Sequence, residues 1–152
     1  MIAMALIGFF NVIGSLAAGV IGQRYSKPYF LALIYIGRSI AVTAFLLLPQ
    51  SPTSVVIFAA VMGLLWLSTV PPTNGLVAIM FGTRHLGLLG GLVFLSHQIG
   101  SFLGVWMGGY LYDRFGTYDQ VWWLGVILGL FAAVVHWPIR EKAVDRPAVV
   151  AA

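Results

Sequence analysis

The sequence predicts an all-α, polytopic membrane protein with five transmembrane helices, and three observations lead to this fold class. Hydrophobic residues make up 61% of the 152 residues and charged residues only 8%, which leaves too little polar surface for a water-soluble domain. The apolar residues form five long runs. Short, turn-like connectors separate each run from the next.

The five predicted helices follow from helix geometry. About 20 apolar residues, at roughly 1.5 Å per residue, cross the ~30 Å hydrocarbon core of a bilayer. The first run follows Met1 without the basic flank of a signal peptide, so we expect it to be retained as a span. The transmembrane region is 1–139, with helices predicted at 2–21, 29–48, 54–80, 86–112 and 121–137. We expect the tail, 140–152, to be cytoplasmic and disordered.

The connectors between the helices are rich in residues that end helices. They span 22–28, 49–52, 81–85 and 113–119. Because they are short, sequential helices are predicted to be antiparallel neighbours. A further interruption is predicted inside the third helix, because Pro71 and Pro72 remove two backbone donors and force a kink or break.

The cations predict which helix ends are cytoplasmic, since cytoplasmic loops collect Lys and Arg. One side of the membrane receives only Arg114, and Arg38 lies inside a helix. The other six cations share the opposite side: Arg24, Lys27, Arg84, Arg140, Lys142 and Arg146. We therefore expect an external N-terminus and a cytoplasmic C-terminus.

A glycine–arginine phrase occurs twice, each time where an apolar run ends. Gly19 and Arg24 belong to the first copy, and Gly109 and Arg114 belong to the second. In the predicted orientation the two copies emerge on opposite sides of the membrane, so the repeat is inverted. Inverted repeats are a common architecture of secondary transporters.

The second copy resembles the loop signature of the major facilitator superfamily, Gly-x-x-x-Asp-Arg-x-Gly. The matching residues are Gly109, Asp113, Arg114 and Gly116. The first copy keeps Gly19, Arg24 and the basic Lys27. It departs from the signature at Gln23 and Ser26, where the family favours Asp and Gly.

Two longer segments, 81–87 and 96–109, are similar to bacterial family members of the monocarboxylate or oxalate/formate type. Family members usually have twelve helices in two bundles of six, each bundle made of two inverted triplets. Five helices that start outside and end inside fit the last five, helices eight to twelve. The resemblance therefore implies a C-terminal fragment that forms part of a six-helix bundle and lacks the N-terminal helices.

The resemblance also implies a function and a location. The expected function is secondary active transport of a small organic solute by alternating access in the bacterial inner membrane, with an organic anion or monocarboxylate as the first expectation. The implied partners are membrane lipid, the solute, and a coupling proton or counter-anion. The alternative is a complete small membrane subunit whose glycine ladders serve as a helix-packing or assembly surface.

Several other classes of function are not expected. The chain has no cysteine, so disulfides and sulfur-based metal sites are excluded. Its basic residues are scattered singly, which argues against a nucleic-acid partner. No catalytic Ser/His/Asp set, paired intramembrane carboxylates or metal-ligand spacing is present, so we expect no enzyme activity, metal or cofactor.

Arg38 is the most conspicuous charge. It lies near the middle of the second predicted helix, where a charged side chain costs roughly 2.5 to 3.5 kcal/mol on insertion scales. All acidic residues lie in connectors or the tail: Asp113, Asp119, Glu141 and Asp145. Its counter-ion must therefore come from missing helices, backbone carbonyls or an anionic substrate. The resemblance places this helix at the bundle periphery, which favours packing or gating support over an anion or relay role.

Polar residues at membrane depth mark a candidate substrate path. His97 and Gln98 lie near the middle of the fourth predicted helix, where His97 can relay a proton, ligate an anion or form an interhelical hydrogen bond. Asn11 is likewise a cavity group or a packing residue. Asn74 follows the two prolines and Trp66 precedes them. Irregular backbone at such depth is tolerated only where protein or a water-filled cavity surrounds it.

The two copies of the phrase are the candidate gate, formed by Gly19, Arg24 and Lys27 at one side and by the signature residues at the other. Glycine permits close helix approach and a left-handed helix exit. Arg114 can satisfy carbonyls at its helix end, and Asp113 can face the positive N-terminus of the next helix. Alternating access requires contacts that form in one conformation and break in another, and structural stapling without gating is the alternative.

Overall fold

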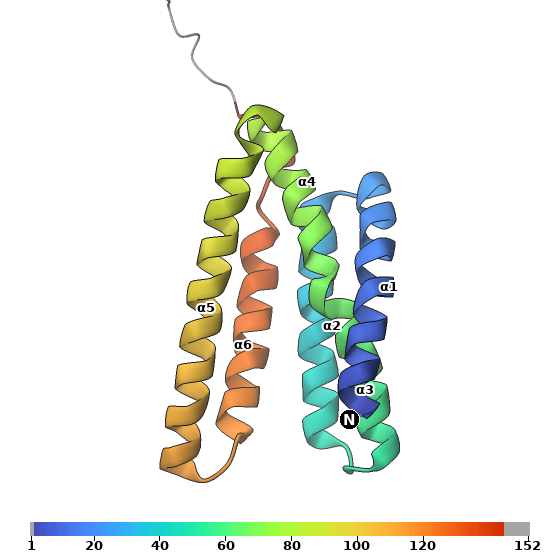
Figure 1. Ribbon diagram of the computed structural model, residues 1–152, viewed down its shortest axis with the longest axis vertical. Helices are drawn as coiled ribbons and strands as arrows, with labels where there is room; N and C mark the ends of the chain where they lie inside the picture. The colour runs from blue at the N-terminus through green and yellow to red at the C-terminus, as the bar shows by residue number, and fades with distance from the viewer. Residues whose placement is uncertain (1, 145–152) are drawn as a thin grey trace, which may run out of the picture.

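The computed structural model describes residues 2–144, and its all-helical architecture with five potential membrane spans confirms the predicted fold class. The five spans run along the array in alternating directions (Figure 1). Its elements are α1 (Ile2–Arg24), α2 (Lys27–Leu47), α3 (Pro52–Trp66), η1 (Leu67–Thr69), α4 (Val70–Phe81), η2 (Thr83–His85), α5 (Leu86–Phe115) and α6 (Asp119–His136). No β-strand occurs in residues 2–144.

The helix ends follow from local residues. Ser51 caps α3, because its Oγ accepts the Ser54 N–H at 3.1 Å while Ser54 Oγ accepts the Ser51 N–H at 2.8 Å. Gly116 ends α5 in the left-handed conformation, with φ of 72°, which costs glycine least. Because α5 continues to Phe115, Asp113 and Arg114 lie in its last turn and not in the predicted connector.

The third span is interrupted as predicted, but the irregular turn lies before the prolines. α3 ends at Trp66, and a 3₁₀ turn leads into α4 at Val70. Pro71 has no N–H and its ring crowds the carbonyl four residues earlier, that of Leu67. The Val70 N–H donates to this carbonyl instead, in the 3₁₀ pattern. Pro71 itself lies in the first turn of α4.

α1 packs mainly against α3, and glycine allows the close approach. A Cβ at Gly14 would overlap the carbonyl oxygen of Leu64. On the facing helix, a Cβ at Gly63 would lie 2.6 Å from the carbonyl oxygen of Ile7. The two backbones therefore meet without intervening side chains at this crossing.

α2 packs mainly against α6, through a second close contact. The buried Ser39 donates its Oγ–H to the Val126 carbonyl oxygen at 3.2 Å. Gly129 makes room for this serine, since a Cβ there would overlap Ser39 Oγ. Sequential helices are antiparallel, as predicted (Figure 1). The tightest contacts nevertheless join helices that do not follow one another in the sequence, because the small residues of these helices lie on the faces that meet.

α5 is the least covered of the long helices. It contributes no buried residue and forms the outer edge of the array beside α6 (Figure 1). Its span is nevertheless long and apolar enough to cross a membrane. A large apolar surface of α5 is therefore free of contacts within residues 2–144.

The segment after α6 closes one end of the array, where the α1–α2 and α4–α5 turns also lie (Figure 1). Lys27 donates to Glu141 twice, from Nζ to Oε1 at 2.7 Å and from its backbone N–H to Oε2 at 2.9 Å. The Val144 N–H donates to the Met80 carbonyl oxygen at 2.9 Å. The start of the tail, 140–144, is thus held to α2 and α4, and the remainder of the predicted disordered tail, 145–152, lies outside the described residues.

Candidate functional site

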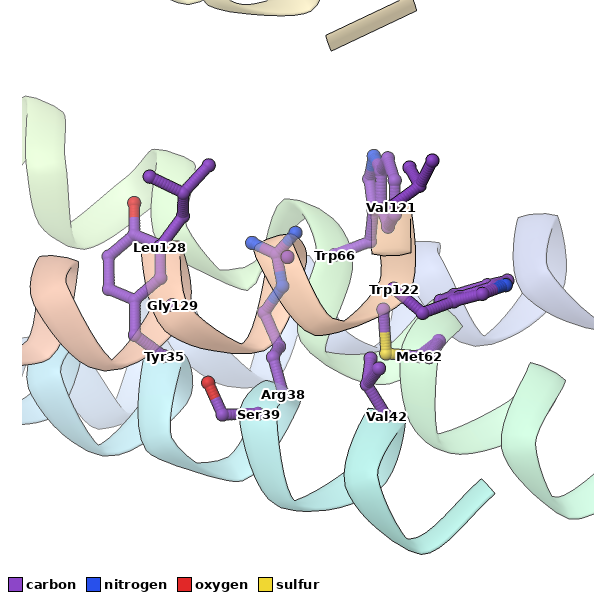
Figure 2. A pocket seen from close by; sticks show the side chains of 11 residues that line it. Tyr35, Arg38, Ser39, Val42, Met62, Trp66, Val121, Trp122, Leu128 and Gly129 are labelled. Carbon is purple, nitrogen blue, oxygen red and sulfur yellow. The ribbon is translucent and has the colours of Figure 1, made fainter. Parts of the chain in front are cut away.

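A cavity of about 310 Å³ lies between α2, α3 and α6 (Figure 2). Its polar and aromatic lining comes from Tyr35, Arg38 and Ser39 of α2, Trp66 of α3 and Trp122 of α6. Aliphatic side chains and glycines complete the wall. The cavity therefore combines one cation with an otherwise largely apolar surface, the usual composition of a small-molecule site.

The sequence spacing on α2 and the glycines of α6 create this cavity. Arg38 and Ser39 follow Tyr35 by three and four residues, so both lie on the Tyr35 face of α2. Across the cavity, Gly125 leaves open space, since nothing lies within 4 Å of the position that its Cβ would take. The Ser39–Gly129 contact holds the two helices together beside this space.

Arg38 is half-buried and flanked by two aromatic rings. Its Cζ lies 5.8 Å from the ring centroid of Tyr35 and 5.2 Å from that of Trp66. Figure 2 shows the guanidinium extending from α2 toward the space between these rings. Cation–π attraction contributes about 0.5 to 2 kcal/mol at such sites. In residues 2–144 the only ion pair is Lys27–Glu141, so no described carboxylate pairs with Arg38.

The predicted path residues do not form one cluster. Trp66 lines the Arg38 cavity. Asn11 lies at the α1–α3 contact, where its Oδ1 accepts the Leu67 N–H at 2.9 Å, at the interruption of the third span. Asn74 is exposed on α4, and His97 and Gln98 are exposed on α5.

The two copies of the glycine–arginine phrase end at opposite ends of the array (Figure 1). In the first copy, Gly19 faces Pro71, whose Cβ would lie 4.0 Å from a Cβ at Gly19, and Arg24 is exposed in the last turn of α1. In the second copy, Arg114 Nη1 donates to the Tyr110 hydroxyl at 3.0 Å. Gly109 is open, with nothing within 4 Å of the Cβ position.

Lys27, the last residue of the first copy, fixes the charge state of Glu141. Partial desolvation acts to raise the pKa of the Glu141 carboxyl, but the hydrogen bonds and charge of Lys27 outweigh it and lower the pKa. The carboxylate therefore stays ionised, and the pair stays formed, until the pH falls through this lowered value. The pair is partly exposed, and a pair that water still reaches contributes on the order of 1 kcal/mol.

Sequence reasoning missed Tyr35, Ser39 and Trp122, which line the cavity together with Arg38. The spacing of Tyr35, Arg38 and Ser39 was visible in the sequence, but the contribution of α6 depends on a packing that the sequence does not state. Chemically, the cavity can hold an anion against the guanidinium and an apolar group against the aromatic walls. No group of three His, Asp or Glu suited to a metal ion occurs in residues 2–144.

Comparisons with known proteins identify the family. The model of the Major Facilitator Superfamily matches residues 1–150. The uncharacterized MFS-type transporter YcxA of Bacillus subtilis (strain 168) is 26% identical over 145 residues, covering 91% of this chain and 36% of the relative. The chain thus spans about a third of that protein's length, and no solved structure matches it significantly. The family match covers nearly the whole chain. This chain therefore belongs to the major facilitator superfamily of multi-pass membrane transporters.

Proposed function

We propose that this chain is part of a secondary active transporter that moves a small organic anion, a monocarboxylate first, by alternating access. The observation that carries the proposal is the pair of glycine–arginine phrases, which end at opposite ends of the helix array (Figure 1). An inverted repeat of this kind supports rocking about a site near the midplane. The family membership supports transport over the alternative of an assembly subunit and over catalysis.

The distribution of charge supports an anionic solute. Arg38 and His97 lie within the spans, whereas Asp113, Asp119 and Glu141 lie at helix ends or beyond them. A path with cationic or neutral polar groups and no carboxylate at depth attracts anions. Accumulation of an anion in a negatively polarised cell requires coupling to an energy source, and in this proposal a coupled proton or an exchanged counter-anion supplies it.

The proposed path and gate use the polar groups that the sequence singles out. The path comprises Asn11, Trp66, Asn74, His97 and Gln98. The gate comprises the two glycine–arginine phrases, whose contacts form and break as the bundles rock. The exposure of His97 and Gln98 supports a further requirement, that the complete transporter has additional helices which cover α5.

A chimera tests the proposed function. The matched third of the Bacillus subtilis relative is replaced by this chain, and the chimera and the 152-residue chain are each reconstituted into proteoliposomes. We expect the chimera to accumulate a radiolabelled monocarboxylate under an imposed pH or anion gradient, and the chain alone to accumulate none. Uptake by the chain alone would contradict the need for further helices. Gradient-driven uptake by the chimera of neutral solutes only would contradict the anion class.

The proposed orientation in the bacterial cell membrane has the N-terminus outside and the C-terminus in the cytoplasm. The chain lacks cysteine, so Gln50→Cys and Thr83→Cys each introduce a single exposed thiol. Gln50 avoids Ser51, which caps α3. We expect a membrane-impermeant maleimide to label the Gln50 variant in intact cells and the Thr83 variant only after permeabilisation. The reverse pattern would invert the topology.

A further inference from the structure

Arg38 is a cation within a membrane span, and residues 2–144 supply no carboxylate that pairs with it. It lies near the middle of α2, where an ionised side chain without a partner is costly. Within residues 2–144 the one ion pair joins Lys27 to Glu141. The groups that face the Arg38 charge in this part of the chain are the rings of Tyr35 and Trp66. Ring faces attract a cation but accept no charge-assisted hydrogen bond. The donors of the guanidinium therefore remain available to an oxygen anion.

The cavity beside this guanidinium has the size and surface of a site for a small amphiphilic ligand. Its volume of about 310 Å³ falls at the lower end of the range of roughly 300 to 1,000 Å³ for ligand pockets. Trp66, Trp122 and Leu128 supply apolar surface for the body of a ligand. The planar guanidinium matches the two oxygens of a carboxylate, a geometry that a spherical halide does not exploit.

We propose that the Arg38 cavity binds a small organic monocarboxylate, with the carboxylate on the guanidinium and the apolar body between the tryptophans. The inference takes the ligand class from the proposed function, and Trp66 is the residue that this binding site shares with the proposed path. Because Arg38 lies near mid-span, lipid headgroups, about 15 Å away at the edge of the hydrocarbon core, do not supply the anion.

Binding of benzoate to the purified 152-residue chain tests the site. The chain is placed in phosphatidylcholine nanodiscs and titrated by calorimetry with benzoate and with its neutral analogue benzamide. We expect saturable benzoate binding that is about tenfold or more tighter than benzamide binding, equivalent to about 1.4 kcal/mol. We expect Arg38→Gln to remove this preference, while Arg84→Gln, the same change at an exposed cation of η2, keeps it.

A cavity-filling variant keeps the test valid if Arg38→Gln fails to fold. Gly125→Leu fills the cavity from a position with no atom within 4 Å and leaves Arg38 intact. We expect it to lose benzoate binding, whereas Gly91→Leu on α5, which is equally open, keeps binding. Equal affinities for benzoate and benzamide, or full benzoate affinity in Gly125→Leu, would overturn the proposal.

The outcome is separable from that of the transport assay. Arg38-dependent benzoate binding by this chain, together with a chimera that transports no anion, would support the site and contradict the proposed function. Anion uptake by the chimera without Arg38-dependent binding would contradict the site alone. A third arm adds phosphatidylglycerol to the nanodiscs at high salt, which screens the repulsion of benzoate by the anionic surface. Loss of benzoate binding there would indicate that the lipid headgroup occupies the site and would overturn the proposal.

Discussion

Replacing Gly14 by alanine is expected to destabilise the protein by about 2 to 3 kcal/mol. The added Cβ would overlap the Leu64 carbonyl oxygen and lie 2.8 Å from Ser68 Oγ. Backbone cannot rotate out of the way as a flexible side chain can, so α1 and α3 must separate along their contact. Denaturation of the detergent-solubilised protein with dodecyl sulfate, followed by circular dichroism, measures the free energy of unfolding.

Two further variants give the Gly14 prediction its controls. Gly8→Ala lies on the same helix with nothing within 4 Å of the new Cβ, so we expect a change within about 0.5 kcal/mol. Gly63→Ala forces α1 and α3 apart in the same way, with the added Cβ on α3 and the crowded carbonyl oxygen on α1. Because the first substitution already separates the helices, the double variant should cost less than the sum of the two single variants. Wild-type stability in Gly14→Ala would contradict the close α1–α3 approach.

Replacing Asn11 by leucine is expected to destabilise the protein by about 1 to 2 kcal/mol and to loosen the interrupted span. The side chain keeps its approximate size but loses Oδ1, which accepts the Leu67 N–H at 2.9 Å. That amide would then lack its acceptor in a medium that offers no water. Hydrogen exchange at Leu67 measures the effect, and about tenfold faster exchange corresponds to 1.4 kcal/mol.

The matched control for this prediction is Asn74→Leu, the same substitution at an exposed position of α4. We expect its unfolding free energy to stay within about 0.5 kcal/mol of wild type and exchange at Leu67 to stay unchanged. If Asn11→Leu leaves both the stability and the Leu67 exchange rate as they are, then the hydrogen bond has no role in fixing the interruption.

Hydropathy and turn residues were sufficient to predict the five spans, because membrane insertion depends on local composition. The exact site of the interruption was missed, since a proline acts on the carbonyl four residues before it and thus moved the irregular turn from Pro71 to Leu67. The end of α5 was also missed, because Gly116 rather than Asp113 ends that helix. Both differences follow from backbone geometry that hydropathy does not contain.

Individual polar residues were predicted better than their groupings. Arg38 and Trp66 were each singled out, but their proximity depends on α2, α3 and α6 meeting around one cavity. That meeting depends on the fit of Ser39 against Gly129, two residues on helices far apart in the sequence. Asn11 was identified as a cavity or packing group, and only the position of α3 reveals the Leu67 amide that it binds.

The unequal lengths of α5 and α6 have a consequence for how the protein responds to its bilayer. α5 has 30 residues and α6 has 18, which correspond to about 45 Å and 27 Å at 1.5 Å per residue. α6 therefore matches a hydrocarbon core of about 30 Å, while α5 must tilt or protrude. Of these two helices, hydrophobic mismatch therefore acts on α5 only. The thickness of the membrane then sets the depth of Arg114, which lies in the last turn of α5.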